Sequence, residues 1–128
     1  MSYKDYNDLD IWQDGIRFVT AIYQATKQFP PDERFGLTSQ IQRAAVSIPS
    51  NIAEGYAQRS DPTLARFLRI AIGSAAEVDT QLLIAQQLQY ISIEQMRDLR
   101  EQVQSLLRRT RAFLLSIERK PTVSSQQS

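Results

Sequence analysis

The stretch RAAVSIPSNIAEGYAQRS, residues 43–60, decides how many helices the middle of the chain contains. Apolar residues recur at steps of three and four along residues 37–58, and this phase continues unchanged past Pro49. A chain that broke at the proline would have no reason to keep its phase, so we predict one helix over 37–58, kinked near Pro49. The alternative is two short helices, which the capping-box-like spacing of Asn51 and Glu54 favours. The apolar positions are Leu37, Ile41, Ala45, Ile48, Ile52 and Tyr56.

Residues 9–29, upstream of this stretch, carry two apolar series at helical spacing. The first is Leu9, Trp12, Ile16, Val19 and Tyr23. The second is Ile11, Phe18, Ile22, Ala25 and Phe29, which lies about 100° round the helix from the first. Together they form an arc wider than one seam needs, so either the core is large or part of the arc faces another subunit.

The downstream half of the chain predicts two more helices. Residues 62–88 carry a wide apolar face, and Pro62 suits the first turn of a helix capped by Ser60 or Asp61. Ser92 and Gln95 have the spacing of a capping box and open a helix with a sustained apolar seam, which extends to Ile117.

Four amphipathic helices joined by short loops predict an all-α fold. We expect a single domain over residues 1–119, an up-down-up-down four-helix bundle. Residues 120–128, KPTVSSQQS, are polar and without periodicity, and we expect a disordered tail there.

The composition excludes several function classes. The 128 residues include no cysteine and no histidine, which removes disulfides, thiolate metal sites and the commonest general base. The net charge of +1 gives no bulk attraction for nucleic acid. No stretch has the pattern of a signal peptide or the length of a membrane span, so we expect a cytoplasmic protein that does not bind membranes.

Carboxylates are the remaining candidates for chemistry, and we interpret them as structural. Glu54, Glu77 and Asp79 lie nearest the apolar stretches, but no nucleophile motif or phosphate-binding loop accompanies them. We therefore expect no enzymatic activity, no catalytic or metal-binding residue and no cofactor.

A polar network is the structural role that we predict for residues around Pro49. Its members are Arg43, Asn51, Glu54 and Glu77. Asn51 and Glu54 should lie on the side of the helix away from Ile48 and Ile52, where they would form hydrogen bonds between helices or between subunits.

A row of arginines in the last helix is the candidate contact surface for nucleic acid or a protein partner. Its members are Arg97, Arg100, Arg108, Arg109 and Arg111. Arg108, Arg109 and Arg111 have no acid three or four residues away, so pairing along the helix cannot neutralise them. The alternatives are a solvated helix face or ion pairs with the helix that carries Glu77 and Asp79.

Two long motifs identify a family resemblance. They are R-A-x-x-S-I-P-x-N-I-A-E-G at 43–55 and R-F-L-x-I-A-x-G-S-x-x-E at 66–77. Both resemble the bacterial four-helix-bundle family first met as reading frames inside intervening sequences of large-subunit ribosomal RNA genes. The resemblance covers residues 8–118 and implies an up-down bundle that assembles into a homo-oligomeric ring of five chains. A related branch resembles accessory proteins of diversity-generating retroelements, which bind RNA and a reverse transcriptase.

Three function classes follow from these observations. We favour a non-enzymatic oligomeric scaffold or adaptor, because it needs only wide apolar faces and an interface. The alternative is an RNA-binding accessory protein that uses the basic face of the last helix. An enzyme is the third class, which the missing catalytic groups disfavour.

Overall fold

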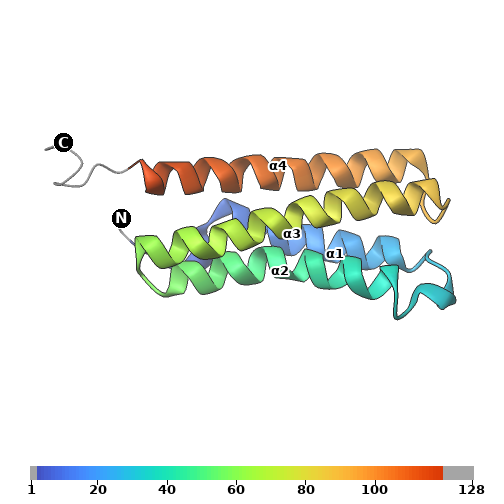
Figure 1. The fold of residues 1–128 in the computed structure, drawn as a ribbon, viewed down its shortest axis with the longest axis horizontal. Helices are drawn as coiled ribbons and strands as arrows, with labels where there is room; N and C mark the ends of the chain where they lie inside the picture. Colours follow the sequence, from blue (N-terminus) through green and yellow to red (C-terminus); the bar gives the residue numbers. More distant parts are fainter. Residues whose placement is uncertain (1–2, 120–128) are drawn as a thin grey trace, which may run out of the picture.

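The computed structural model describes residues 3–119, and this part of the chain is all-α. Its four helices lie side by side along the long axis of the molecule (Figure 1). A turn of 3-10 helix precedes α1 and another precedes α2. The predicted tail at 120–128 lies outside the described residues. The helices are α1 Asp10–Thr26, α2 Leu37–Ala57, α3 Asp61–Gln87 and α4 Ile93–Glu118.

Helix α2 continues through Pro49, which confirms the prediction of one helix and makes the two-helix alternative wrong. The apolar phase on both sides of the proline packs into the same core, and Ile48 and Ile52 are both fully buried. Pro49 itself packs on α1 at Gly15, where an added Cβ would lie 3.2 Å from the Pro49 Cβ. The proline ring thus packs directly on the backbone of α1, which approaches α2 closely because Gly15 has no side chain.

The ends of the helices use the caps that the sequence indicated. Ser60 accepts a hydrogen bond from the Thr63 amide at the start of α3. Ser92 and Gln95 form a reciprocal capping box at the start of α4, with donor–acceptor distances of 2.9 and 3.0 Å. These bonds satisfy amides that have no partner inside the helix.

Helix α2 begins with a cap that the sequence did not indicate. Its N-cap residue is Gly36, which has no side chain, and Glu33 from the preceding turn accepts a hydrogen bond from the Leu37 amide instead (3.0 Å). The other oxygen of Glu33 accepts from the Tyr90 hydroxyl (2.7 Å). The bond from the Leu37 amide, followed by that from Tyr90, lowers the pKa of Glu33. One carboxylate therefore joins the α1–α2 and α3–α4 connections at the same end of the bundle.

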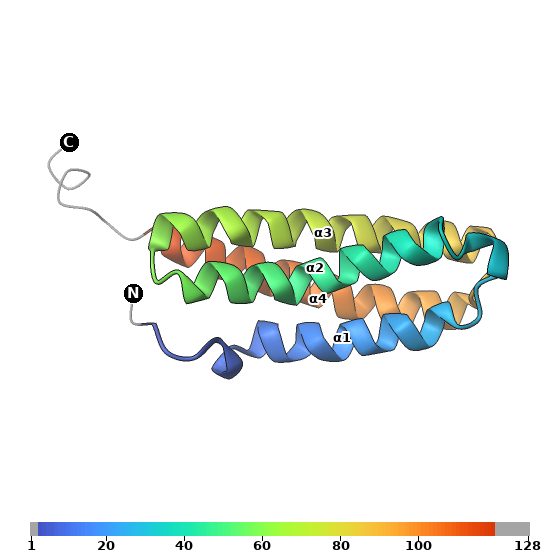
Figure 2. The ribbon, with the colours of Figure 1, turned by 90° about the horizontal axis from the view of Figure 1, so that it is seen from below.

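The opposite end is closed by residues 3–9, which we call the N-terminal arm. It runs beside the bundle toward the α2–α3 turn (Figure 2). The Tyr3 hydroxyl donates to Asp61, and the Arg59 guanidinium donates to the Tyr3 carbonyl (3.0 Å). The Tyr3 ring lies 5.1 Å from that of Tyr56 between centroids. Burial, followed by the bond to Asp61, raises the pKa of Tyr3.

The core takes residues from all four helices, but α1 contributes only part of its apolar arc. Ile11, Phe18 and Ile22 are buried, whereas Ile16 and Tyr23 are each 43% exposed. The second apolar series of the sequence therefore faces the core. Of the first series, Leu9, Trp12 and Val19 are partly buried against the core, and only Ile16 and Tyr23 are exposed. Large side chains that are almost fully buried are Phe18, Ile22, Ile41, Ile48, Ile52, Leu64, Leu68, Val78, Leu82, Val103 and Leu106.

Candidate interaction surfaces

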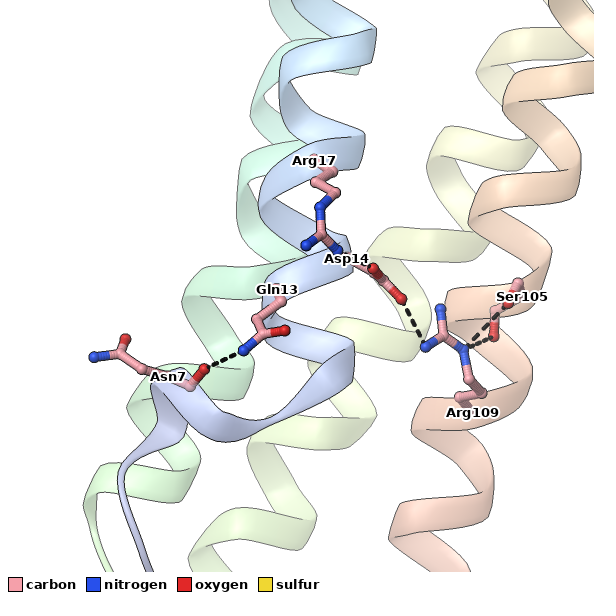
Figure 3. Close-up of polar contacts among 6 residues, drawn as sticks. All are labelled: Asn7, Gln13, Asp14, Arg17, Ser105 and Arg109. Atoms are coloured by element: carbon pink, nitrogen blue, oxygen red, sulfur yellow. Dashed lines mark hydrogen bonds and ion pairs between the residues drawn. The ribbon is translucent and has the colours of Figure 1, made fainter.

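Two of the five predicted contact arginines on α4 are held in ion pairs with other helices. Arg100 donates to both carboxylate oxygens of Asp79 on α3, at 2.8 and 3.3 Å. Arg109 donates to Asp14 on α1 at 2.9 Å (Figure 3). The bond to Asp79 raises the pKa of Arg100, and the bond from Arg109 lowers that of Asp14. For these two arginines, the alternative of pairing between helices holds.

Asp14 sits at the centre of a small polar cluster between α1 and α4. Its other oxygen accepts from Arg17 at 2.5 Å, and the Arg109 guanidinium also bonds the hydroxyl of Ser105 at 3.2 Å (Figure 3). The cluster borders a cleft of about 340 Å³ that Phe18 and Glu101 also line. All of its charges are partly exposed, so we assign it a role in aligning the two helices rather than a large stabilisation.

The other three arginines remain available to a partner. Arg97, Arg108 and Arg111 are exposed and make no hydrogen bond or ion pair within residues 3–119. Their spacings of 11 and 3 residues place them on one side of α4. We call these three residues the α4 arginine face; it is smaller than the row predicted from the sequence.

The predicted polar network of Arg43, Asn51, Glu54 and Glu77 is not assembled within the single chain. Asn51 bonds inside its own helix, to the carbonyl and hydroxyl of Ser47 at 2.7 and 2.8 Å. Glu77 accepts from Gln81, one turn further along α3.

Arg43 and Glu54 are exposed and have no polar partner among the described residues. Glu54 accepts no hydrogen bond from another helix within the described residues, because its side chain lies on the outer face of α2, in solvent. Contacts of these residues between subunits stay a prediction.

The link between α2 and α3 is made by a pair of serines that the sequence analysis did not assign to it. The hydroxyls of Ser47 and Ser74 lie 2.8 Å apart, and Asn51 joins them through Ser47. Ser47, a small polar residue close to Pro49, was the sequence signal that could have indicated this bond. Spacing along the sequence does not show which way its hydroxyl points or that Ser74 is its partner.

Large apolar side chains are exposed on several outer faces of the bundle. Ile16 on α1 and Val46 on α2 border an apolar groove of about 250 Å³ that Trp12 and Pro49 also line, and Tyr23 is exposed about two turns after Ile16 on α1. Others lie on α3, α4 and the loops at the Glu33 end of the bundle. The exposed set is Ile16, Tyr23, Phe35, Val46, Ile70, Leu83, Ile84, Leu88, Ile93 and Leu115, with exposed fractions from 38% to 87%.

The described residues offer little to metals or bilayers. Residues 3–119 contain no group of three or more Asp or Glu side chains placed to hold a metal ion. None of the four helices combines the length and the hydropathy that a membrane span needs.

Comparison with known proteins identifies a family and a structural neighbour. A family model described as 23S rRNA-intervening sequence protein matches residues 7–112. A solved structure from Bacteroides thetaiotaomicron, described as a protein of unknown function from the S23 ribosomal protein family, superposes with a TM-score of 0.76. It is 22% identical, over 81% of this chain and 97% of that one, and a likeness at this identity shows the fold alone. No curated protein matches the chain.

Proposed function

The chain belongs to the 23S rRNA-intervening sequence protein family, and from that premise we propose that it is a non-enzymatic, homo-oligomeric scaffold. Its unit is the up-down-up-down bundle, and its assembly is a ring of five copies, as the family resemblance implies. The ring presents repeated surfaces on which other macromolecules gather.

The observation that carries this proposal is the apolar surface left outside the core. Monomeric proteins rarely expose contiguous patches of large apolar side chains, and such patches mark interaction sites. On α1, Ile16 borders the groove at Trp12 and Val46, and Tyr23 is exposed seven residues further along, so the exposure follows a helix face rather than scattered positions. A second helix face of the same kind lies on α3, at Ile70, Ile84 and Leu88.

We expect a particle several times heavier than the 14.7 kDa chain, and five times heavier if the ring has five copies. Light scattering on a size-exclusion column, from about 1 to 100 µM protein, measures this mass. A monomer at every concentration would overturn the proposal, whereas a mass that rises with concentration gives the association constant that the variants below are compared with.

RNA binding is the second candidate function, supported by the α4 arginine face. Three exposed arginines without acidic partners on one helix side are suited to phosphate contacts, and a ring would repeat them in every copy. Arg100 and Arg109 are excluded from this role as long as Asp79 and Asp14 hold them.

If RNA binds there, the double variant Arg108→Ala, Arg111→Ala should bind more weakly and with a smaller dependence on salt. Each lost phosphate contact lowers the salt slope by about 0.7–0.9. Titration of structured and single-stranded RNA at two salt concentrations measures both effects. Arg34→Ala, in the loop at the Glu33 end of the bundle, is the control that should leave binding unchanged. Equal binding by wild type and double variant would reject this face as an RNA site.

A further inference from the structure

The outer faces of α2 and α3 share a register that the contacts between them fix. Ser47 on α2 lies opposite Ser74 on α3, with 2.8 Å between the hydroxyls. Eight residues further along α2, Gly55 lies against Phe67 of α3. The helices are therefore antiparallel. A residue that precedes Ser47 on α2 lies at the same level along the bundle as one that follows Ser74 on α3 by about the same number of residues.

Four exposed charges occupy two of these levels. Arg43 comes one turn before Ser47, and Glu77 comes about one turn after Ser74, so the two side chains lie at one level. Glu54 precedes Gly55 and Arg66 precedes Phe67, so this second pair lies at another level. Eleven residues separate the charges on each helix, which is about 16 Å. We call Arg43, Glu54, Arg66 and Glu77 the α2–α3 charge rectangle.

The charges of the rectangle are not neutralised by ion pairs within the described residues. None of the four forms an ion pair within residues 3–119. Glu77 accepts one hydrogen bond from Gln81, and the Arg66 guanidinium lies over the ring of its neighbour Phe67. The signs alternate around the rectangle and sum to zero, so this surface does not attract a polyanion but complements a surface with the same pattern.

We propose that this face is where one copy of the chain docks on the next, with Arg43 and Glu54 of one copy meeting Glu77 and Arg66 of the neighbour. A neighbour whose bundle axis is parallel keeps every residue at its own level. Its α2, set beside α3 of the first copy, brings Arg43 level with Glu77 and Glu54 level with Arg66. The contact joins two different surfaces, so its repetition generates a ring when the rotation closes. This inference rests on the proposed homo-oligomer and assigns its interface.

The surface between the charges suits close packing of a second copy. Gly73 on α3 is exposed, and a Cβ added there would meet no atom within 4 Å, so nothing in its own chain requires a glycine in mid-helix. Ile70 beside it is 43% exposed, and Ile84 and Leu88 continue the same helix side. The strip from Arg66 to Leu88 is about 33 Å long and, one helix or about 10 Å wide, covers on the order of 330 Å². That is less than the roughly 800 Å² per partner of a stable pairwise interface, so the contact depends on ring closure, in which each copy makes two such contacts, one through α2 and one through α3.

Charge reversal tests the assignment. Arg43→Glu and Glu77→Arg, each alone, should place like charges against each other and shift assembly to a concentration at least about tenfold higher. Mixed in equal amounts, the two variants should move the midpoint most of the way back to that of wild type. In an alternating ring of five, four contacts set opposite charges against each other, and only one contact joins two copies of the same variant. Light scattering gives the assembly midpoint, and co-purification of differently tagged variants identifies mixed particles.

The controls separate this interface from the fold and from the proposed function. Lys27→Glu reverses an exposed charge at the end of α1, on neither α2 nor α3, and should leave the midpoint unchanged. Circular dichroism melts check that each variant folds. An oligomeric wild type whose midpoint neither reversal moves would overturn the interface but not the oligomer, and so would a failure of mixing to restore assembly. A monomeric wild type would overturn both.

Discussion

Gly55→Ala is expected to lower the free energy of unfolding by about 2–3 kcal/mol, because it overpacks the contact between α2 and α3. A Cβ at this position would lie 2.6 Å from the Phe67 Cβ and 3.3 Å from the Leu64 Cα. Neither atom belongs to the flexible end of a side chain, so the two helices must separate to admit the methyl group. Separation loosens the contacts of Leu64 and Leu68, which are fully buried. Denaturant unfolding followed by circular dichroism measures the loss.

Gly73→Ala is the matched control, since it adds the same methyl group to α3 where no atom lies within 4 Å. It should stabilise the chain by about 0.5–1 kcal/mol through higher helix propensity. Both variants should be compared at a protein concentration low enough that association does not contribute. Equal stability changes for the two alanines would show that α2 and α3 do not approach closely at Gly55.

Helix number and most helix ends were predictable because they depend on neighbours in the sequence. The unbroken apolar phase around Pro49 predicted one helix, since a buried stripe on both sides of the proline must face one core. The capping box of Ser92 and Gln95 was likewise a local pattern. Glu33 as the cap of α2 was not predictable, because its carboxylate acts from a separate turn and is held by Tyr90 from the other connection.

The sequence also could not predict which face of α1 points toward the core. Its two apolar series are equally regular, and periodicity gives their angular separation but not their direction. The structure places Phe18 and Ile22 in the core and leaves Ile16 and Tyr23 exposed, while Trp12 and Val19 of the same series are partly buried. This division of the arc could not follow from the pattern alone.

The arginines of α4 show the limit of reasoning from spacing. Arg109 has no acid within four residues of it in the sequence. Its partner is Asp14, 95 residues away in the sequence, brought near by the packing of α1 against α4. Arg100 finds Asp79 in the same way across α3 and α4. Charges that are unpaired along a helix are therefore candidates for contacts between helices before they are candidates for a ligand.

The N-terminal arm is held to the bundle by a buried ring, that of Tyr56, and the apolar periodicity of α2 does not distinguish this ring from the other core positions. Tyr56 is 5% exposed, and its ring lies 5.1 Å from that of Tyr3 and 6.5 Å from that of Phe113. Its hydroxyl accepts a hydrogen bond from the Lys4 amide at 3.3 Å. It therefore joins the arm, α2 and α4 at one end of the bundle.

Tyr56→Ala should lower the free energy of unfolding by about 3–5 kcal/mol, because it removes a buried aromatic ring and leaves a cavity. It should also release the arm, so that amide hydrogen exchange in residues 3–9 approaches the rate of an unfolded chain while exchange in α3 stays slow. Tyr56→Phe is the control: it keeps the ring and loses only the hydrogen bond to Lys4, which costs about 0.5–1.5 kcal/mol. If the phenylalanine variant released the arm as fully as the alanine variant, the hydrogen bond rather than the ring contact would hold it. An alanine variant within about 1 kcal/mol of wild type would instead show that this end of the bundle is closed without Tyr56.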